Sequence, residues 1–131
     1  MKKTALLNAA LSGLVAAMGH GDTLVIGDAG LPVPPGVPVI DLAVSPGTPS
    51  LQVVLAAVLS ELRVESYIVA TELDEADTPL NKWIASSLDG TVRQVCSHAD
   101  LKLHCAKARA VVRTGEFTPY ANVILSAGVV F

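Results

Sequence analysis

The chain has 131 residues, enough for a single domain, residues 1–131, whose apolar core needs neither disulfides nor metal ions. It is 51% hydrophobic and carries a formal net charge of −3, which argues against a nucleic-acid partner because phosphate binding needs a basic surface. Only 16% of the residues are charged, a low share for a fully solvated surface, so we expect apolar surface to be buried between subunits.

The first predicted element is a helix that begins after Asn8 and ends at Gly19. Its apolar residues recur at the spacing i, i+3, i+4 and i+7: Leu11, Leu14, Val15 and Met18. Lysines followed by apolar residues also resemble a secretion signal, but Asn8 and Ser12 interrupt the apolar stretch and no clear cleavage site follows. We therefore expect a structural helix in a cytoplasmic protein. No apolar run is long enough to span a membrane.

A short apolar strand is predicted next, at Thr23–Ile26, with His20 just before it and Asp28 just after it. Three prolines and a glycine between residues 34 and 38 then predict an extended loop. A second strand is predicted at Val39–Val44.

The strongest helix pattern begins where Thr48 can cap and Pro49 can occupy the first helical position. Its apolar stripe recurs every three or four residues: Leu51, Val54, Leu55, Val58, Leu59 and Leu62. The remaining predicted elements are, in chain order, a strand at Glu65–Thr71, a helix opened by Thr78 and Pro79 and ending near Leu88, a strand at Thr91–Val95, a helix capped by Ser97 and ending near His104, a strand at Ala108–Arg113, and two short strands or one bent strand at Ala121–Phe131.

Strands and helices therefore alternate, which predicts an α/β fold of three layers, α/β/α, around a largely parallel, or else mixed, central sheet. Ligands in such sheets bind at the carboxyl ends of the strands. Asp28 follows the first strand, so it is expected at that edge.

Several sequence motifs of common active sites are absent. The segment GDAG at 27–30 is no dinucleotide fingerprint, because GxGxxG must open a helix and prolines follow here instead. The chain also lacks a phosphate-binding loop, a GxSxG nucleophile elbow and an HxxxH pair. Cys96 and Cys105 cannot complete a zinc site, so we interpret them as reduced, semi-buried thiols and expect no metal.

Five polar residues beside predicted strand ends and loops are candidates for chemistry: His20, Asp28, His98, Tyr120 and Asn122. The residue pattern alone leaves an ordinary structural role open for each. A histidine at a helix end is often a cap, and an aspartate in a glycine-rich bend often stabilises a turn. His98 just past a helix cap, and Lys102 one turn later, are also consistent with a solvated surface. A tyrosine at a strand start is commonly buried with one hydrogen bond.

Three segments together resemble the D-ribose pyranase family, which is related to L-fucose mutarotase. They are GHGDTLVIGDAGLPVP at 19–34, IDLAVSPGTPS at 40–50 and VVRTGEFTPYANVILSAGVVF at 111–131. The resemblance covers essentially the whole chain and is weakest at 72–110. It implies a cofactor-free isomerase that interconverts the β-pyranose and β-furanose rings of free D-ribose and so supplies furanose for phosphorylation.

The same resemblance implies an assembly and a set of site residues. Family members are homo-oligomers, decamers of two stacked five-membered rings, with the active site at a subunit boundary. His20 falls on the family's catalytic histidine. The positions that fall on substrate contacts are Asp28, His98, Tyr120, Ala121 and Asn122.

The chemistry explains why a histidine suits this role. Opening a pyranose removes a proton from one oxygen and adds one to another, and imidazole can do both because its pKa of about 6.5 is near neutral pH. If His20 and Asp28 face opposite ends of their strand, a neighbouring chain must complete the pocket. Two alternatives stay open: a non-catalytic ribose-binding or transporter-associated module, and a mutarotase for another sugar such as fucose.

Overall fold

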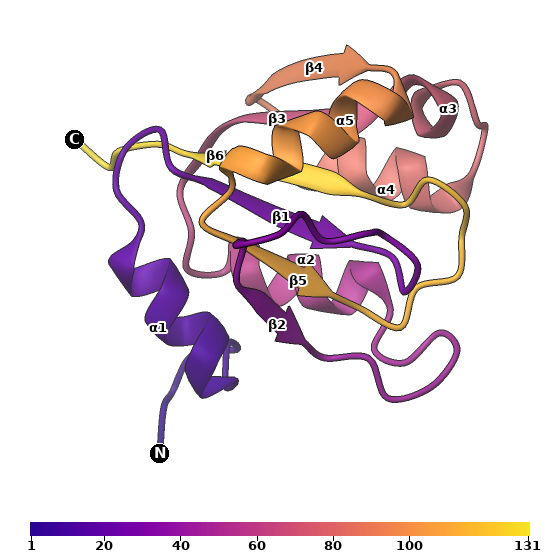
Figure 1. The fold of residues 1–131 in the computed structure, drawn as a ribbon. Helices are drawn as coiled ribbons and strands as arrows, with labels where there is room; N and C mark the ends of the chain where they lie inside the picture. Colours follow the sequence, from indigo (N-terminus) through magenta and orange to yellow (C-terminus); the bar gives the residue numbers. More distant parts are fainter.

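One six-stranded sheet forms the centre of the chain in a computed structural model that describes all 131 residues (Figure 1). Its strands are β1 (Thr23–Gly27), β2 (Val39–Asp41), β3 (Val64–Ala70), β4 (Val92–Cys96), β5 (Ala110–Arg113) and β6 (Val123–Ala127). No helix has both the length and the apolar character needed to cross a membrane.

The sheet is mixed, with the strand order β2-β5-β1-β6-β3-β4. β1, β2, β3, β4 and β5 all run in one direction, while β6 lies antiparallel between β1 and β3. The sequence-based expectation of a largely parallel or mixed sheet is therefore confirmed. β6 returns the chain through the middle of the sheet, which brings the segment before it to the edge where the other strands end.

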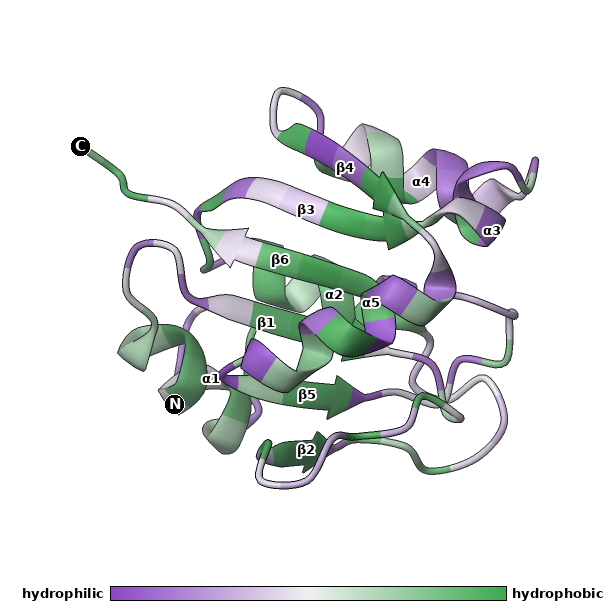
Figure 2. Ribbon diagram, turned by 45° about the horizontal axis from the view of Figure 1, so that its top comes forward, coloured by the Kyte–Doolittle hydropathy of each residue, from purple (hydrophilic) through white to green (hydrophobic).

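Helices cover both faces of this sheet (Figures 1 and 2). They are α1 (Ala9–Ala17), α2 (Leu51–Leu59), α3 (Thr71–Asp74), α4 (Pro79–Ser87) and α5 (His98–His104), followed by the short 3₁₀ helix Cys105–Lys107. In both views α5 lies on one face, and α2 and α4 lie on the other. This arrangement confirms the predicted α/β/α layers.

Consecutive residues of β1 point into two different cores, because side chains alternate across a strand. Leu24 and Ile26 belong to the larger core, which the sheet forms with α1, α2 and α4. Val25 belongs to the smaller core, together with Leu101 of α5 and Cys105. A strand covered on both faces has an uninterrupted apolar sequence, which is why this run was recognisable.

The start of α2 differs from the expectation. Ser50 is the N-cap, and its side chain accepts a hydrogen bond from the Val53 N–H at 3.3 Å. Thr48 does not cap, because its backbone is committed to a turn: its carbonyl accepts from Val44 N–H at 3.0 Å and its own N–H donates to the Ser45 carbonyl at 2.9 Å. The predicted caps Asn8, Thr78 and Ser97 are confirmed.

Three strands are shorter than expected, and one of them is β5, which begins at Ala110 instead of Ala108. β2 stops at Asp41, whose carboxylate accepts from the Ala43 N–H at 3.0 Å and turns the chain out of the sheet. At the C-terminus there is one strand instead of a bent or double one, and it ends at Ala127. One residue past this strand, the Gly128 N–H still donates to the Arg63 carbonyl at 2.8 Å.

Candidate functional site

Five strands end at one edge of the sheet and β6 begins there; we call this the carboxyl edge, and the opposite one the amino edge. Asp28 follows β1 at the carboxyl edge, and His98 follows β4. Tyr120 and Asn122 come just before β6, in the connection from β5. The topology therefore brings four of the candidate residues to the same edge.

Asp28 and Asn122 form a closed pair at this edge. The Asn122 side-chain oxygen accepts from the Asp28 N–H at 2.9 Å, and the Asn122 amide nitrogen donates to Asp28 Oδ2 at 3.0 Å. The other carboxylate oxygen, Oδ1, accepts from the Gly30 N–H at 2.9 Å. Asn122 is fully buried whereas Asp28 is half-buried, so the amide fixes the direction of a carboxylate that solvent still reaches.

Gly27 makes room for this pair. A Cβ at this position would lie 2.6 Å from Leu31 Cδ2 and 3.0 Å from Asn122 Oδ1. Any side chain here would therefore push on the amide that holds Asp28.

His98 and Tyr120 form a second contact. Their ring centroids are 5.1 Å apart at an interplanar angle of 77°, an edge-to-face geometry. The backbone N–H of His98, in the first turn of α5, donates to the Glu72 carboxylate, with Oε2 at 3.0 Å. His98 Nδ1 is buried and has no hydrogen-bond partner, so this ring has unused polar capacity. Tyr120 has a φ of 62°, a left-handed conformation that bulky residues rarely adopt and that strained functional loops often contain.

A cavity of about 410 Å³ opens beside Asp28. It is lined by Asp28, Ala29, Gly30, Arg113, Glu116, Phe117, Thr118 and Pro119. Two partners hold the guanidinium of Arg113: Nε donates to the Ala29 carbonyl at 3.0 Å, and Nη1 pairs with Asp41 at 2.9 Å. The volume lies in the usual range for a small polar ligand.

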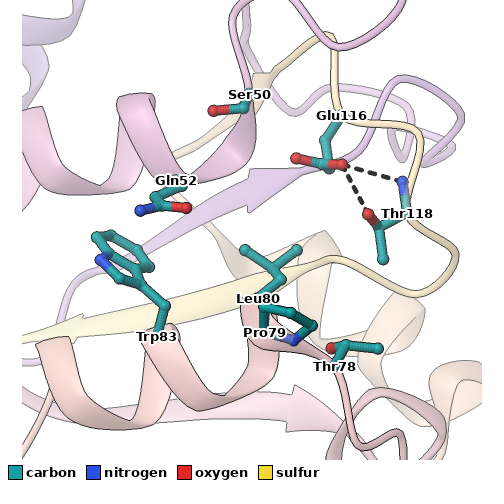
Figure 3. Close-up of a pocket in the computed structure, with 8 residues that line it drawn as sticks. All are labelled: Ser50, Gln52, Thr78, Pro79, Leu80, Trp83, Glu116 and Thr118. Atoms are coloured by element: carbon teal, nitrogen blue, oxygen red, sulfur yellow. Dashed lines mark hydrogen bonds between the residues drawn. The ribbon is translucent and has the colours of Figure 1, made fainter.

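An adjoining cavity of about 570 Å³ shares Glu116 and Thr118 with the first (Figure 3). Its other lining residues are Ser50, Gln52, Thr78, Pro79, Leu80 and Trp83. Glu116 therefore lines both cavities. Partial burial raises the pKa of Glu116, but hydrogen bonds from Thr118, Leu51 and Phe117 outweigh it and leave the pKa below its ordinary value.

His20 lies at the amino edge, away from these residues. It precedes β1, and the adjacent Gly21 N–H donates to the carbonyl of Ala127, where β6 ends. Its Nε2 contacts Glu65 Oε2 at 2.9 Å, and 61% of the side chain is exposed. The five residues of β1 that separate His20 from Asp28 span roughly 16 Å. One pentose cannot touch both residues within a single chain.

The structure therefore brings Asp28, His98, Tyr120 and Asn122 to one edge and leaves His20 at the other. Ala121, between Tyr120 and Asn122, is fully buried, and its N–H donates to the Thr118 carbonyl at 3.3 Å. Lys102 is exposed on α5.

Sequence reasoning missed three charged residues at the carboxyl edge: Glu72, Arg113 and Glu116. One signal was available, because each lies at or just after the end of a predicted parallel strand, where ligand-binding loops gather. Their specific partners lie far away in the chain and leave no local pattern.

No group of three or more His, Cys, Asp or Glu side chains is arranged to hold a metal ion. Both cysteines are free thiols, and burial raises the pKa of Cys105 to about 11, which keeps it protonated at neutral pH.

Comparison with known proteins identifies close relatives. A family model described as the RbsD / FucU transport protein family matches residues 1–130. A D-ribose pyranase from Paracidovorax citrulli is 59% identical, and one from Pseudomonas putida is 56% identical; both alignments cover all of each chain.

Solved structures agree with this result. Bacillus subtilis RbsD complexed with D-ribose matches with a TM-score of 0.95 and 45% identity, with both chains covered completely. The fucose mutarotase from Streptococcus pneumoniae, in complex with L-fucose, matches with a TM-score of 0.83 and 25% identity, again over both whole chains.

Proposed function

Because the chain belongs to the RbsD / FucU transport protein family, we propose that it is an isomerase that interconverts the β-pyranose and β-furanose rings of free D-ribose. Relatives at 52–59% identity over the whole chain are named D-ribose pyranase, and a relative of nearly superimposable fold binds D-ribose. The fucose-binding relative is more distant in both sequence and fold. Ribose is therefore the substrate that the comparisons favour.

The observation that carries the mechanism is the separation of the candidate groups between the two edges. The carboxyl edge offers an oriented carboxylate and two aromatic rings beside a cavity, which suits recognition of an uncharged polyol. The amino edge offers one exposed imidazole. A complete site needs the amino edge of one copy against the carboxyl edge of another.

In this site His20 transfers the protons. Its free imidazole nitrogen removes the proton from the anomeric hydroxyl and then returns it to the ring oxygen, as the C–O bond of the ring breaks and the open aldehyde forms. After rotation, attack of a different hydroxyl closes the other ring with the reverse transfers. Glu65 contacts Nε2 of His20, which orients the imidazole and leaves Nδ1 for the sugar.

The carboxyl edge holds the sugar during these steps. Asp28 accepts hydrogen bonds from sugar hydroxyls, because each carboxylate oxygen has capacity beyond its present single partner. Asn122 sets the orientation of that carboxylate. His98 and Tyr120 supply a wall and polar atoms on the other side, and the backbone of Ala121 lies between Tyr120 and Asn122.

The assembly that this site requires is a ring, since each copy gives one edge and receives the other. A head-to-tail contact of this kind closes into a cyclic oligomer, and a decamer of two five-membered rings satisfies the requirement. Exposed apolar side chains support burial between copies, among them Val130 at 87% and Phe131 at 101%. We propose a cytoplasmic location, because free ribose would be phosphorylated in the cytoplasm.

The function is tested by saturation-transfer NMR on ribose with catalytic amounts of the protein. We expect faster exchange between the pyranose and furanose signals than in buffer. Ribose binding without faster exchange would favour a non-catalytic binding module. Acceleration of fucose anomer exchange, but not of ribose ring exchange, would favour a mutarotase.

A further inference from the structure

The connection between β5 and β6 carries three of the candidate contact residues but has no regular structure. It spans residues 114–122, and its side chains Phe117 and Tyr120 are 65% and 42% exposed. Loops of this length and exposure are usually among the least rigid parts of a fold. The position of Tyr120 and Asn122 therefore needs a specific anchor.

Glu116 supplies an anchor inside this connection (Figure 3). Its Oε1 accepts from the Thr118 hydroxyl at 2.8 Å, from the Thr118 N–H at 3.0 Å and from the Phe117 N–H at 3.1 Å. Its Oε2 accepts from the Leu51 N–H at 3.1 Å. Leu51 is the first residue of α2, where backbone N–H groups lack helical partners and favour a negative charge. One carboxylate thus ties the loop both to itself and to a helix.

The anchor continues into the site through the backbone. Thr118, held by Glu116, accepts the N–H of Ala121 at 3.3 Å, and the Tyr120 carbonyl accepts the N–H of Asn122 at 2.8 Å. Asn122 in turn holds Asp28. A chain of hydrogen bonds therefore runs from α2 through Glu116 to the carboxylate proposed to bind the sugar.

A second support fixes the base of the same loop. The Thr114 hydroxyl donates to the Gly27 carbonyl at 2.8 Å and accepts from the Glu116 N–H at 3.1 Å. The Ala29 N–H donates to the Glu116 carbonyl at 2.9 Å. Glu116, which lines the 410 Å³ cavity, is consequently held through both its backbone and its side chain.

From these contacts we infer that Glu116 is a positioning residue for ribose binding: its carboxylate sets the place of Tyr120, Ala121 and Asn122, and through Asn122 that of Asp28. This inference rests on the proposed function. In this inference Glu116 transfers no proton. Its replacement should therefore weaken ribose binding more than it slows turnover at saturating ribose.

The test replaces Glu116 by glutamine, which keeps the shape but turns one acceptor oxygen into a donor facing N–H groups. We expect the ribose Kd, measured by NMR titration, to rise on the order of tenfold, the effect of losing one charged hydrogen bond. Ring exchange at saturating ribose should stay within about twofold of wild type. Glu75→Gln is the matched control, because Glu75 is exposed and far from the loop in the chain.

A milder variant keeps the inference testable if Glu116→Gln folds poorly. Thr118→Val removes one donor to the carboxylate and leaves the charge in place, and we expect a Kd increase of a few-fold. Wild-type Kd in either folded variant would overturn the inference. A loss of exchange at saturating ribose with unchanged Kd would also overturn it, because it would place Glu116 in the chemistry. Wild-type protein that fails to accelerate exchange would instead contradict the proposed function.

Discussion

The two edges of the sheet differ in how firmly their functional groups are held. At the carboxyl edge, Asp28 is oriented by a fully buried amide, and Glu116 joins the surrounding loop to α2. At the amino edge, His20 has one contact, to Glu65, and most of its side chain is exposed. A rigid recognition surface and a free imidazole on one chain are complementary halves. The difference supports our proposal that the fold builds each half separately and that assembly unites them.

The largest expected effect comes from removing the imidazole. His20→Ala should lower the ring-exchange rate by roughly 10²–10⁴-fold, the usual contribution of a general acid–base group. The melting temperature should barely change, because an exposed ion pair contributes little to stability. Saturation-transfer NMR and thermal melts of the same samples measure both quantities. Exchange that persists at the wild-type rate would remove His20 from the mechanism.

Disrupting the carboxyl edge should instead affect stability and binding together. Asn122→Ala leaves the half-buried Asp28 N–H without its acceptor, so we expect a loss of about 1–3 kcal/mol of unfolding free energy. Ribose affinity should fall in the same variant, because the carboxylate loses its orienting donor. Denaturant unfolding and NMR titration provide the readouts. If Asn122→Ala is as stable as wild type, the carboxyl edge is not held more firmly than the amino edge in the way described above.

A pH series sharpens the comparison through Glu116. Its pKa in the folded protein is below its ordinary value of 4.5, so its ionised form favours folding. This contribution is complete above the unfolded-state pKa and disappears as the pH falls through the lower folded-state value. The difference in melting temperature between wild type and Glu116→Gln should therefore be constant near neutral pH and shrink below about pH 4.5. A difference that stays constant into acid would mean that the charge of Glu116 does not stabilise the loop.

The smallest effect is expected for the partner of His20. Glu65→Gln keeps a hydrogen-bond acceptor but removes the charge beside the imidazole, so the exchange rate should fall only a few-fold. The exchange rate of this variant is followed by the same NMR method. A rate loss as large as that of His20→Ala would give Glu65 a direct part in the chemistry.

Local patterns predicted what depends on neighbouring residues. The apolar run of β1, the caps Asn8, Thr78 and Ser97, and the placement of His20 and Asp28 at opposite ends of one strand all follow from short-range rules. The antiparallel insertion of β6 did not follow, because strand order depends on contacts between distant segments. The same reason hid the Asp28–Asn122 pair, whose members are 94 positions apart, and the Glu116–Leu51 bond.

The most direct test of the divided site mixes two variants that we expect to be inactive, because one lacks the imidazole and the other lacks the carboxylate that binds the sugar. His20→Ala and Asp28→Asn, each carrying a different tag, are co-expressed, and oligomers that contain both are isolated by sequential affinity steps. If the site combines His20 of one copy with Asp28 of its neighbour, about a quarter of the interfaces in a random equal mixture carry both native residues. Ring exchange should then recover to about that fraction of the wild-type rate. Mixed oligomers that remain as inactive as the two parents would contradict a site shared between copies.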